Sequence, residues 1–143
     1  MLEGILYSLI LVFRKKAGRI IEFDELSSKV IGCAIEVHKQ LGPGLLESTY
    51  ERCLSYELLC AGIQHETQKE LPIDYKGTKL ECGYRVDLFV DNKLIVELKA
   101  VDKLLPIHEA QILTYMKLAN IKTGLLLNFN VVRFKDGIKR LVL

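Results

Sequence analysis

The stretch GYRVDLFVDNKLIVELKA, residues 83–100, decides the fold, because it is an apolar hairpin interrupted by ionisable side chains. Val, Leu, Ile and Phe dominate both halves, which predicts two strands around a turn. Asp87 lies inside the first predicted strand, and Glu97 and Lys99 lie inside the second. Burying an unpaired carboxylate costs several kcal/mol or more, so we expect these charges to have partners and to mark a site.

The length of the turn determines how the two predicted strands pair. A three-residue loop sets Asp87 opposite Glu97 and Arg85 opposite Lys99 on one face of the hairpin. The same register collects apolar side chains on the other face: Val86, Leu88, Val90, Leu94, Val96 and Leu98. A two-residue loop would break both faces.

Opposed carboxylates repel each other, so we expect a cation between Asp87 and Glu97. Mg²⁺ (or Mn²⁺) is the natural candidate, because Mg²⁺ prefers oxygen ligands and takes one or two carboxylates, waters and substrate phosphate oxygens. Lys99 could orient or help deprotonate an attacking water. The alternative is a salt-bridge ladder on a solvated sheet face, made of Arg85, Asp87, Glu97 and Lys99, and spacing alone leaves both possibilities open.

The composition describes a soluble globular protein of one domain without a marked charge bias. Of the 143 residues, 50% are hydrophobic and 27% are charged, and the formal net charge is +2. This balance is too mild to indicate nucleic-acid binding, although it permits a local basic face. The four cysteines form no C-x-x-C pair, so we expect free thiols in a reducing cytoplasm rather than zinc ligands.

Residues 1–20 are expected to form an extension outside the main domain, which we assign to residues 21–143. The run from Ile5 to Phe13 is mostly apolar, but it is too short to span a bilayer and no basic residues precede it. We therefore expect neither a transmembrane segment nor a signal peptide. Packing on the domain, a homodimer contact, or membrane-surface contact through residues 5–16 remain alternatives.

Hydrophobic periodicity and turn residues predict the order α-α-β-β-β-α-β-β, an α/β (α+β) fold with a mixed central sheet flanked by helices. The glycines and proline of LGPGL separate the first two predicted helices. The predicted helices cover residues 24–41, 45–61 and 106–120. The predicted strands cover residues 70–75, 79–90, 93–100, 123–129 and 138–142.

An acidic residue, a hairpin and E-x-K, here Asp87 with Glu97-Leu98-Lys99, resemble the motif of the PD-(D/E)XK nuclease superfamily. GLLESTY, from Gly44 to Tyr50, resembles the signature of one small bacterial and archaeal branch, the GxxExxY family. Neighbouring segments are similar to that family as well: AIEVHKQLGPGLLESTYERCL, CGYRVDLFV, IVELKAVDKLLPIHEAQILTYM and GLLLNFNV. The likeness covers roughly residues 24–143. It departs from the superfamily motif where Val86 replaces the proline before the acidic residue.

The resemblance implies a restriction-endonuclease-like core and a metal-dependent nuclease acting on phosphodiester bonds of DNA or RNA. It implies that Glu47 supplies a carboxylate from the second helix and that Gln111 lines the same pocket. In this interpretation one or two Mg²⁺ ions are held by Asp87, Glu97, Glu47 and the Leu98 carbonyl, with Lys99 steadying the nucleophile. The alternatives are a nucleic-acid-binding or scaffold module without useful turnover, and a hydrolase of small phosphodiesters.

Arg85, Tyr50, His108 and Tyr115 are expected to contact substrate, and a structural role is the alternative. Tyr50 follows Glu47 by one helical turn and can pack beneath the site instead. His108, with Gln111 and Tyr115, lies on one helix face by i, i+3, i+7 spacing, but it can equally be a helix-start residue. On the same helix a more apolar side is predicted at Ala110, Leu113 and Met116. Glu47 also suits a helix start, because the helix dipole favours a carboxylate there.

Overall fold

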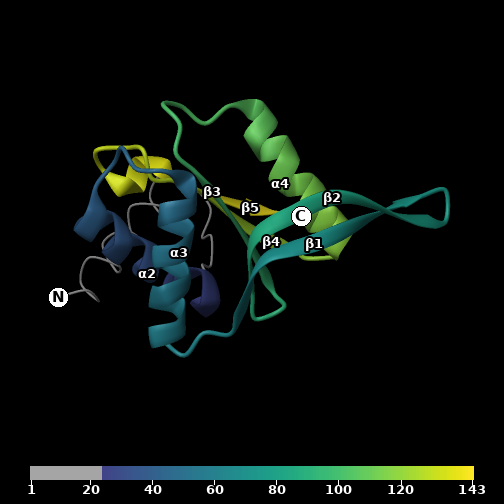
Figure 1. Cartoon of the computed structure of the whole chain (residues 1–143), viewed down its shortest axis with the longest axis horizontal. Helices are drawn as coiled ribbons and strands as arrows, with labels where there is room; N and C mark the ends of the chain where they lie inside the picture. Colours follow the sequence, from purple (N-terminus) through teal and green to yellow (C-terminus); the bar gives the residue numbers. More distant parts are fainter. Residues whose placement is uncertain (1–23) are drawn as a thin grey trace.

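The computed structural model describes residues 24–143, which form a five-stranded mixed sheet with helices on both faces (Figure 1). The predicted extension, residues 1–20, lies outside the described residues. The elements in chain order are α2 (Glu25–Leu41), α3 (Glu47–Cys60), β1 (His65–Tyr75), β2 (Thr78–Val90), β3 (Leu94–Lys99), α4 (Pro106–Ala119), β4 (Thr123–Asn128), the short 3-10 helix η1 (Phe134–Gly137) and β5 (Ile138–Val142).

The strands lie in the sheet in their order along the chain, β1-β2-β3-β4-β5. Neighbouring strands are antiparallel except for β3 and β4, which run parallel and are connected through α4. A parallel pair needs such a crossover, because the chain must return to the same end of the sheet. The predicted mixed sheet flanked by helices is confirmed.

Side chains that alternate along the central strands form two hydrophobic layers, one on each face of the sheet. Leu88, Val96 and Leu125 pack with α2 and α3, whereas Ile95 and Leu126 pack with α4. In Figure 1, α2 and α3 accordingly lie on one side of the strands and α4 on the other. Burial on both faces explains why β3 and β4 read as nearly continuous apolar runs.

The first two helices begin and end at residues with the required chemistry. The Asp24 carboxylate accepts a hydrogen bond from the Ser27 backbone N–H at 2.7 Å and caps α2. The helix ends at Gly42, which has a φ of 65°, and the chain after α3 turns at Gly62, which has a φ of 71°. These boundaries set Glu47 at the first position of α3.

The buried face of α4 differs from the predicted one. Ile112, Tyr115 and Met116 are its buried residues, whereas Ala110 is exposed, so the predicted apolar side was wrong for Ala110. Tyr115 instead lies in the hydrophobic cluster with Ile95 and Leu126 of the sheet.

Strands β1 and β2 form a long ribbon whose far half projects beyond the rest of the sheet (Figure 1). We call residues 72–85, most of which are exposed, the arm. Strand β1 begins at His65, five residues before the predicted start at residue 70, because its polar first half pairs with β2 from Val90 onward. A polar edge strand carries no alternating apolar signal, so only its partner reveals it.

Candidate active site

The β2–β3 hairpin has the register that a three-residue loop predicts. Val90 pairs with Leu94, and Leu88 pairs with Val96, which confirms this part of the prediction. The ladder of backbone pairs ends there, ahead of the two acidic residues. Asp87 and Glu97 therefore do not form the backbone pair that the predicted register gives them, and their side chains connect the two strands instead.

Beyond the ladder, the two acidic side chains connect the strands. The Asp87 backbone N–H donates to Glu97 Oε1 at 3.0 Å, and the Leu98 backbone N–H donates to Asp87 Oδ2 at 2.9 Å. Each carboxylate thus accepts the hydrogen bond that a backbone carbonyl would otherwise accept. The geometry keeps Asp87 and Glu97 as cross-strand neighbours at the point where the strands separate.

The same separation changes the faces of β2. Val86 packs in the hydrophobic cluster with α4, whereas Leu88 packs with α2 and α3, so the predicted common face of these two residues was wrong. Gln68, which lies across from Asp87 on β1, has a φ of 51° and forms no ladder pair, although the pairs on either side of it are intact. The register of β1 and β2 shifts only further along, between Leu71 and Ile73.

Glu97 is the most strongly perturbed acid in the described chain. Only 5% of its surface is exposed. Burial raises the pKa of Glu97 to about 9, and the neighbouring Asp87 charge raises it further, while the Asp87 N–H and Lys99 oppose the shift. In the absence of a cation, Glu97 therefore holds its proton at neutral pH.

Glu47 approaches these carboxylates from the start of α3. Partial burial raises its pKa, the Lys99 charge lowers it, and the Asp87 charge raises it. These electrostatic interactions bring Glu47, Asp87 and Lys99 into one charged cluster. No ion pair among residues 24–143 joins Asp87 or Glu97 to Arg85 or Lys99, so the predicted alternative of a salt-bridge ladder is not observed.

Two neighbouring residues were not predicted from the sequence. Gln68 Nε2 donates to Glu51 Oε1 at 2.7 Å and to Asp87 Oδ1 at 3.2 Å, which connects α3 to the site through β1. Glu51 follows Glu47 by four residues, so helical spacing could have revealed it. No sequence signal identifies Gln68, because its position depends on the irregularity in β1.

The donor set is suited to a hard divalent cation. Asp87 and Glu97 supply carboxylate oxygens, and a cation would offset the repulsion that raises the Glu97 pKa. Within residues 24–143, however, no three His, Cys, Asp or Glu side chains are grouped closely enough to hold one ion. One or two carboxylates suffice for Mg²⁺, so this pair fits, whereas ligation by Glu47 and by the Leu98 carbonyl stays a prediction.

Tyr50 is fully buried and stacks on Phe129, with ring centroids 4.6 Å apart. Its hydroxyl donates to the Gly42 carbonyl at 2.6 Å and accepts from the Leu45 N–H at 3.1 Å. These contacts agree with the structural role that the sequence analysis gives as the alternative for Tyr50, because they fix the glycine-rich loop that precedes Glu47. They offer no support for an expected contact with substrate.

His108 and Arg85, which are also predicted to contact substrate, form contacts with other residues of the chain. His108 Nδ1 accepts from the Leu105 N–H at 3.0 Å at the start of α4, as a helix-start histidine does. Arg85 forms an ion pair with Glu70 across the β1–β2 ribbon at 3.0 Å. Their contact with substrate stays a prediction.

Gln111 and Tyr115 extend the cluster toward α4. Gln111 Nε2 donates to the Tyr115 hydroxyl at 2.9 Å. Burial raises the pKa of Tyr115, and the Glu97 charge raises it as well, which indicates that Tyr115 lies near the carboxylates. The structure thus brings together Asp87, Glu97, Lys99 and Glu47, with the Gln111–Tyr115 pair beside them.

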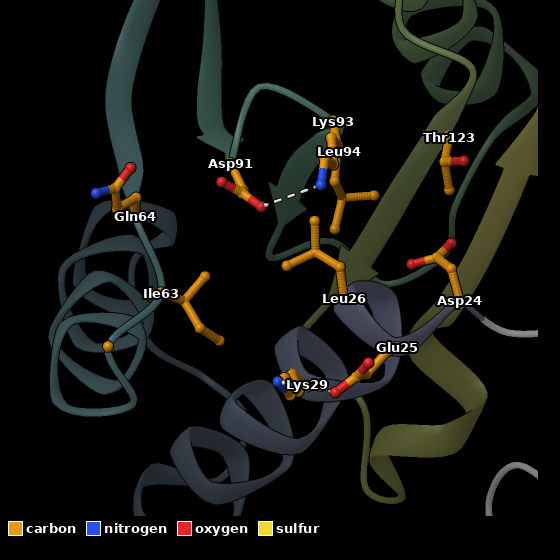
Figure 2. A pocket seen from close by; sticks show the side chains of 11 residues that line it. Asp24, Glu25, Leu26, Lys29, Ile63, Gln64, Asp91, Lys93, Leu94 and Thr123 are labelled. Carbon is orange, nitrogen blue, oxygen red and sulfur yellow. Dashed lines mark ion pairs between the residues drawn. The ribbon is translucent and has the colours of Figure 1, made fainter.

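A cavity of about 680 Å³ lies away from this cluster of side chains (Figure 2). It is lined at the amino ends of β3 and β4 by Leu94 and Thr123, and by Leu26 of α2 and Ile63 of the chain after α3. The carboxylates lie toward the other end of β3, and none of the predicted site residues lines this cavity. The cavity is therefore not the candidate active site, although it is large.

Comparison with known proteins gives one match. The model of the PD-(D/E)XK nuclease superfamily matches residues 24–141, which include the cluster, strands β1 to β4 and all of β5 except its last residue. The mixed sheet with flanking helices agrees with that fold. No curated protein and no solved structure matches the chain. None of the helices between residues 24 and 143 is long and apolar enough to cross a membrane.

Proposed function

We propose that this chain, which belongs to the PD-(D/E)XK nuclease superfamily, is a divalent-metal-dependent nuclease of the GxxExxY type. Membership of the superfamily supports nuclease activity and a nucleic-acid substrate, and its nucleases typically use divalent metals. We propose Mg²⁺ or Mn²⁺ as the ion and the phosphodiester bond of DNA or RNA as the target.

One observation carries the proposal: two carboxylates are anchored to each other's strand at an opening of the sheet. Their repulsion contributes to the raised pKa of Glu97, although burial is the larger cause. A fold that served only stability would gain from an amide in place of one acid, because the amide would keep an acceptor and would not need to take up a proton to be buried beside the other acid. A bound divalent cation would use both acids as ligands.

The proposed roles follow from the positions of the side chains. Asp87 and Glu97 would hold the ion, which would polarise the scissile phosphate and lower the pKa of a bound water. Lys99 lies two residues beyond Glu97 on β3, and its ammonium group would orient the water and balance negative charge in the transition state. Glu47 would accept a hydrogen bond from that water, and Gln111 would orient Tyr115 beside the phosphate.

The test is incubation of the full chain with single-stranded and duplex DNA and RNA in Mg²⁺, Mn²⁺ or a chelator. Glu97→Gln and Asp87→Asn should abolish metal-dependent cleavage. Glu25→Gln is the matched control, because Glu25 is an exposed acid of α2 that pairs with Lys29 and lies away from the carboxylates. Cleavage that survives both site variants would overturn the proposal.

A second function has one observation in its favour. Since no three candidate ligands converge within residues 24–143, a nucleic-acid-binding module that keeps the fold without turnover is the alternative. Salt-sensitive binding of nucleic acid, with no cleavage in either metal, would support that alternative.

A further inference from the structure

A small pocket lies at the root of the arm, where the arm meets α4. Its volume is about 220 Å³, and it is lined by Ile73, Tyr84, Gln111, Thr114, Tyr115 and Leu118. Ile73 and Tyr84 come from the two strands of the arm, and the other four residues come from α4. Figure 1 shows α4 lying beside the ribbon where the arm leaves the sheet.

The pocket combines an aromatic wall with a polar edge. The rings of Tyr84 and Tyr115 are 6.2 Å apart between centroids and are inclined at 56°. Tyr84 is 42% exposed, so part of its surface is open to a ligand, whereas Tyr115 is buried. Gln111 adds an amide that is oriented by its hydrogen bond to the Tyr115 hydroxyl.

The pocket adjoins the carboxylate cluster. Tyr84 precedes Asp87 by three residues on β2, which is about 10 Å along an extended strand. Val86, the residue before Asp87, packs in the same hydrophobic cluster as Tyr115. A ligand that reached from the carboxylates along β2 toward the arm would therefore meet Tyr84.

The size of the pocket limits what it can hold. Pockets for drug-sized ligands measure about 300–1,000 Å³, so this one suits a single flat ring system rather than a whole nucleotide. Nucleobases stack on tyrosine rings in proteins that bind single strands, and every base offers a face for that contact. Of the parts of a polynucleotide, one base therefore fits the size of this pocket and its tyrosine rings.

We propose that this pocket binds one unstacked base of a single-stranded nucleic acid, adjacent to the phosphate that a cation held by Asp87 and Glu97 would contact. The choice of a polynucleotide as the ligand rests on the proposed nuclease function. A base within an intact duplex is stacked and paired, so it cannot enter the pocket. The site therefore prefers single strands, or the unpaired ends and loops of larger nucleic acids.

The test uses oligonucleotides in which the fluorescent adenine analogue aminopurine replaces one base at successive positions. The full chain is present in Ca²⁺, a hard divalent cation that takes the same oxygen ligands, with a chelator for comparison. Stacking on Tyr84 should quench the fluorescence at one position of the single strand and at none in the duplex. Tyr84→Ala should abolish the quenching and weaken single-strand binding by roughly 5- to 150-fold. Tyr84→Phe should retain both.

Tyr75→Ala is the matched control, because Tyr75 is another exposed tyrosine of the arm and does not line the pocket. It should behave as the unaltered protein. Equal losses in Tyr75→Ala and Tyr84→Ala, equal quenching in duplex and single strand, or binding without quenching would each overturn the base pocket. So would an absence of binding.

Cleavage is measured separately in Mg²⁺ and Mn²⁺, so the two proposals can fail independently. Position-specific quenching without cleavage would overturn the nuclease function and keep the base pocket. Cleavage of single strands and duplexes alike, without quenching, would overturn the base pocket and keep the nuclease function.

Discussion

Asp87 and Glu97 hold the open end of the β2–β3 hairpin together reciprocally. Glu97 accepts a hydrogen bond from the backbone of Asp87 at 3.0 Å, while the Asp87 side chain accepts one from Leu98, the residue after Glu97. The two acids are therefore structural acceptors as well as candidate metal ligands. Substitutions that keep an acceptor and those that remove it should have different effects.

Asp87→Asn and Asp87→Ala should separate these two roles. The amide oxygen of asparagine can still accept the Leu98 N–H and carries no charge, so metal-free thermal stability should be equal to or higher than that of the unaltered protein. Alanine leaves that N–H without its acceptor and should cost about 1–3 kcal/mol of unfolding free energy. Both variants should lose stabilisation by Mg²⁺. Thermal and urea unfolding, with and without metal, measure the difference, and equal destabilisation by both variants would contradict it.

The stability of the metal-free protein should fall as pH rises toward 9. Burial raises the pKa of Glu97 from 4.5 to about 9, so between these values the unfolded chain loses a proton that the folded chain retains. The folded state then binds more protons, and unfolding becomes easier as pH increases. Glu97→Gln should make this dependence flatter. Urea unfolding between pH 5 and 9 gives the comparison, with Glu25→Gln as a control that should follow the unaltered protein.

Metal affinity should increase with pH over the same interval. An ion at Asp87 and Glu97 must displace the proton held by Glu97, so affinity should rise by about tenfold per pH unit below the Glu97 pKa. Calorimetric titrations of Mg²⁺ or Mn²⁺ in buffers of different ionisation enthalpy should show release of close to one proton. A pH-independent affinity would show that the ion does not bind at Glu97.

Tyr50→Phe should loosen the loop that sets the start of α3. The variant keeps the stacking on Phe129 but leaves the Gly42 carbonyl and the Leu45 N–H without their hydroxyl partner. We expect a loss of about 1–2 kcal/mol in urea unfolding and weaker cleavage, because Glu47 follows this loop directly. Full stability in the variant would show that the loop does not depend on the hydroxyl.

A truncated chain beginning at Ile21 should retain the fold and the metal site, although a contact between subunits could be lost. The superfamily match begins at residue 24, where α2 is capped by Asp24, so the matched domain does not include the predicted extension. Circular dichroism, metal-dependent melting and solution mass are the measurements. A truncated chain that fails to fold would show that the extension belongs to the core.

Local patterns predicted the parts of the site that depend on one hairpin. The length of the turn and the alternation of apolar residues are enough to give the pairing of Leu88 with Val96 and the proximity of Asp87 to Glu97. These features were predictable because both strands are adjacent in sequence and one slip in register would expose their apolar side chains.

The features that the sequence did not reveal depend on contacts with other elements. Val86 packs with α4 although its neighbour Leu88 packs with α2 and α3, and Gln68 contacts Asp87 only because the polar first half of β1 pairs with β2. The burial of Tyr115 likewise depends on how α4 packs against the sheet. Such contacts leave no periodic signal in the residues that make them.

The reciprocal bonds at the open end of the hairpin also make two backbone amides reporters of the site. In most of a sheet, solvent exchange of an amide hydrogen reports the opening of backbone pairs. The amide hydrogens of Asp87 and Leu98 are instead protected by carboxylates. We expect their exchange rates to follow the charge and occupancy of those carboxylates, so deuterium uptake at these two positions can report ligand binding without a substrate, a fluorescent label or turnover.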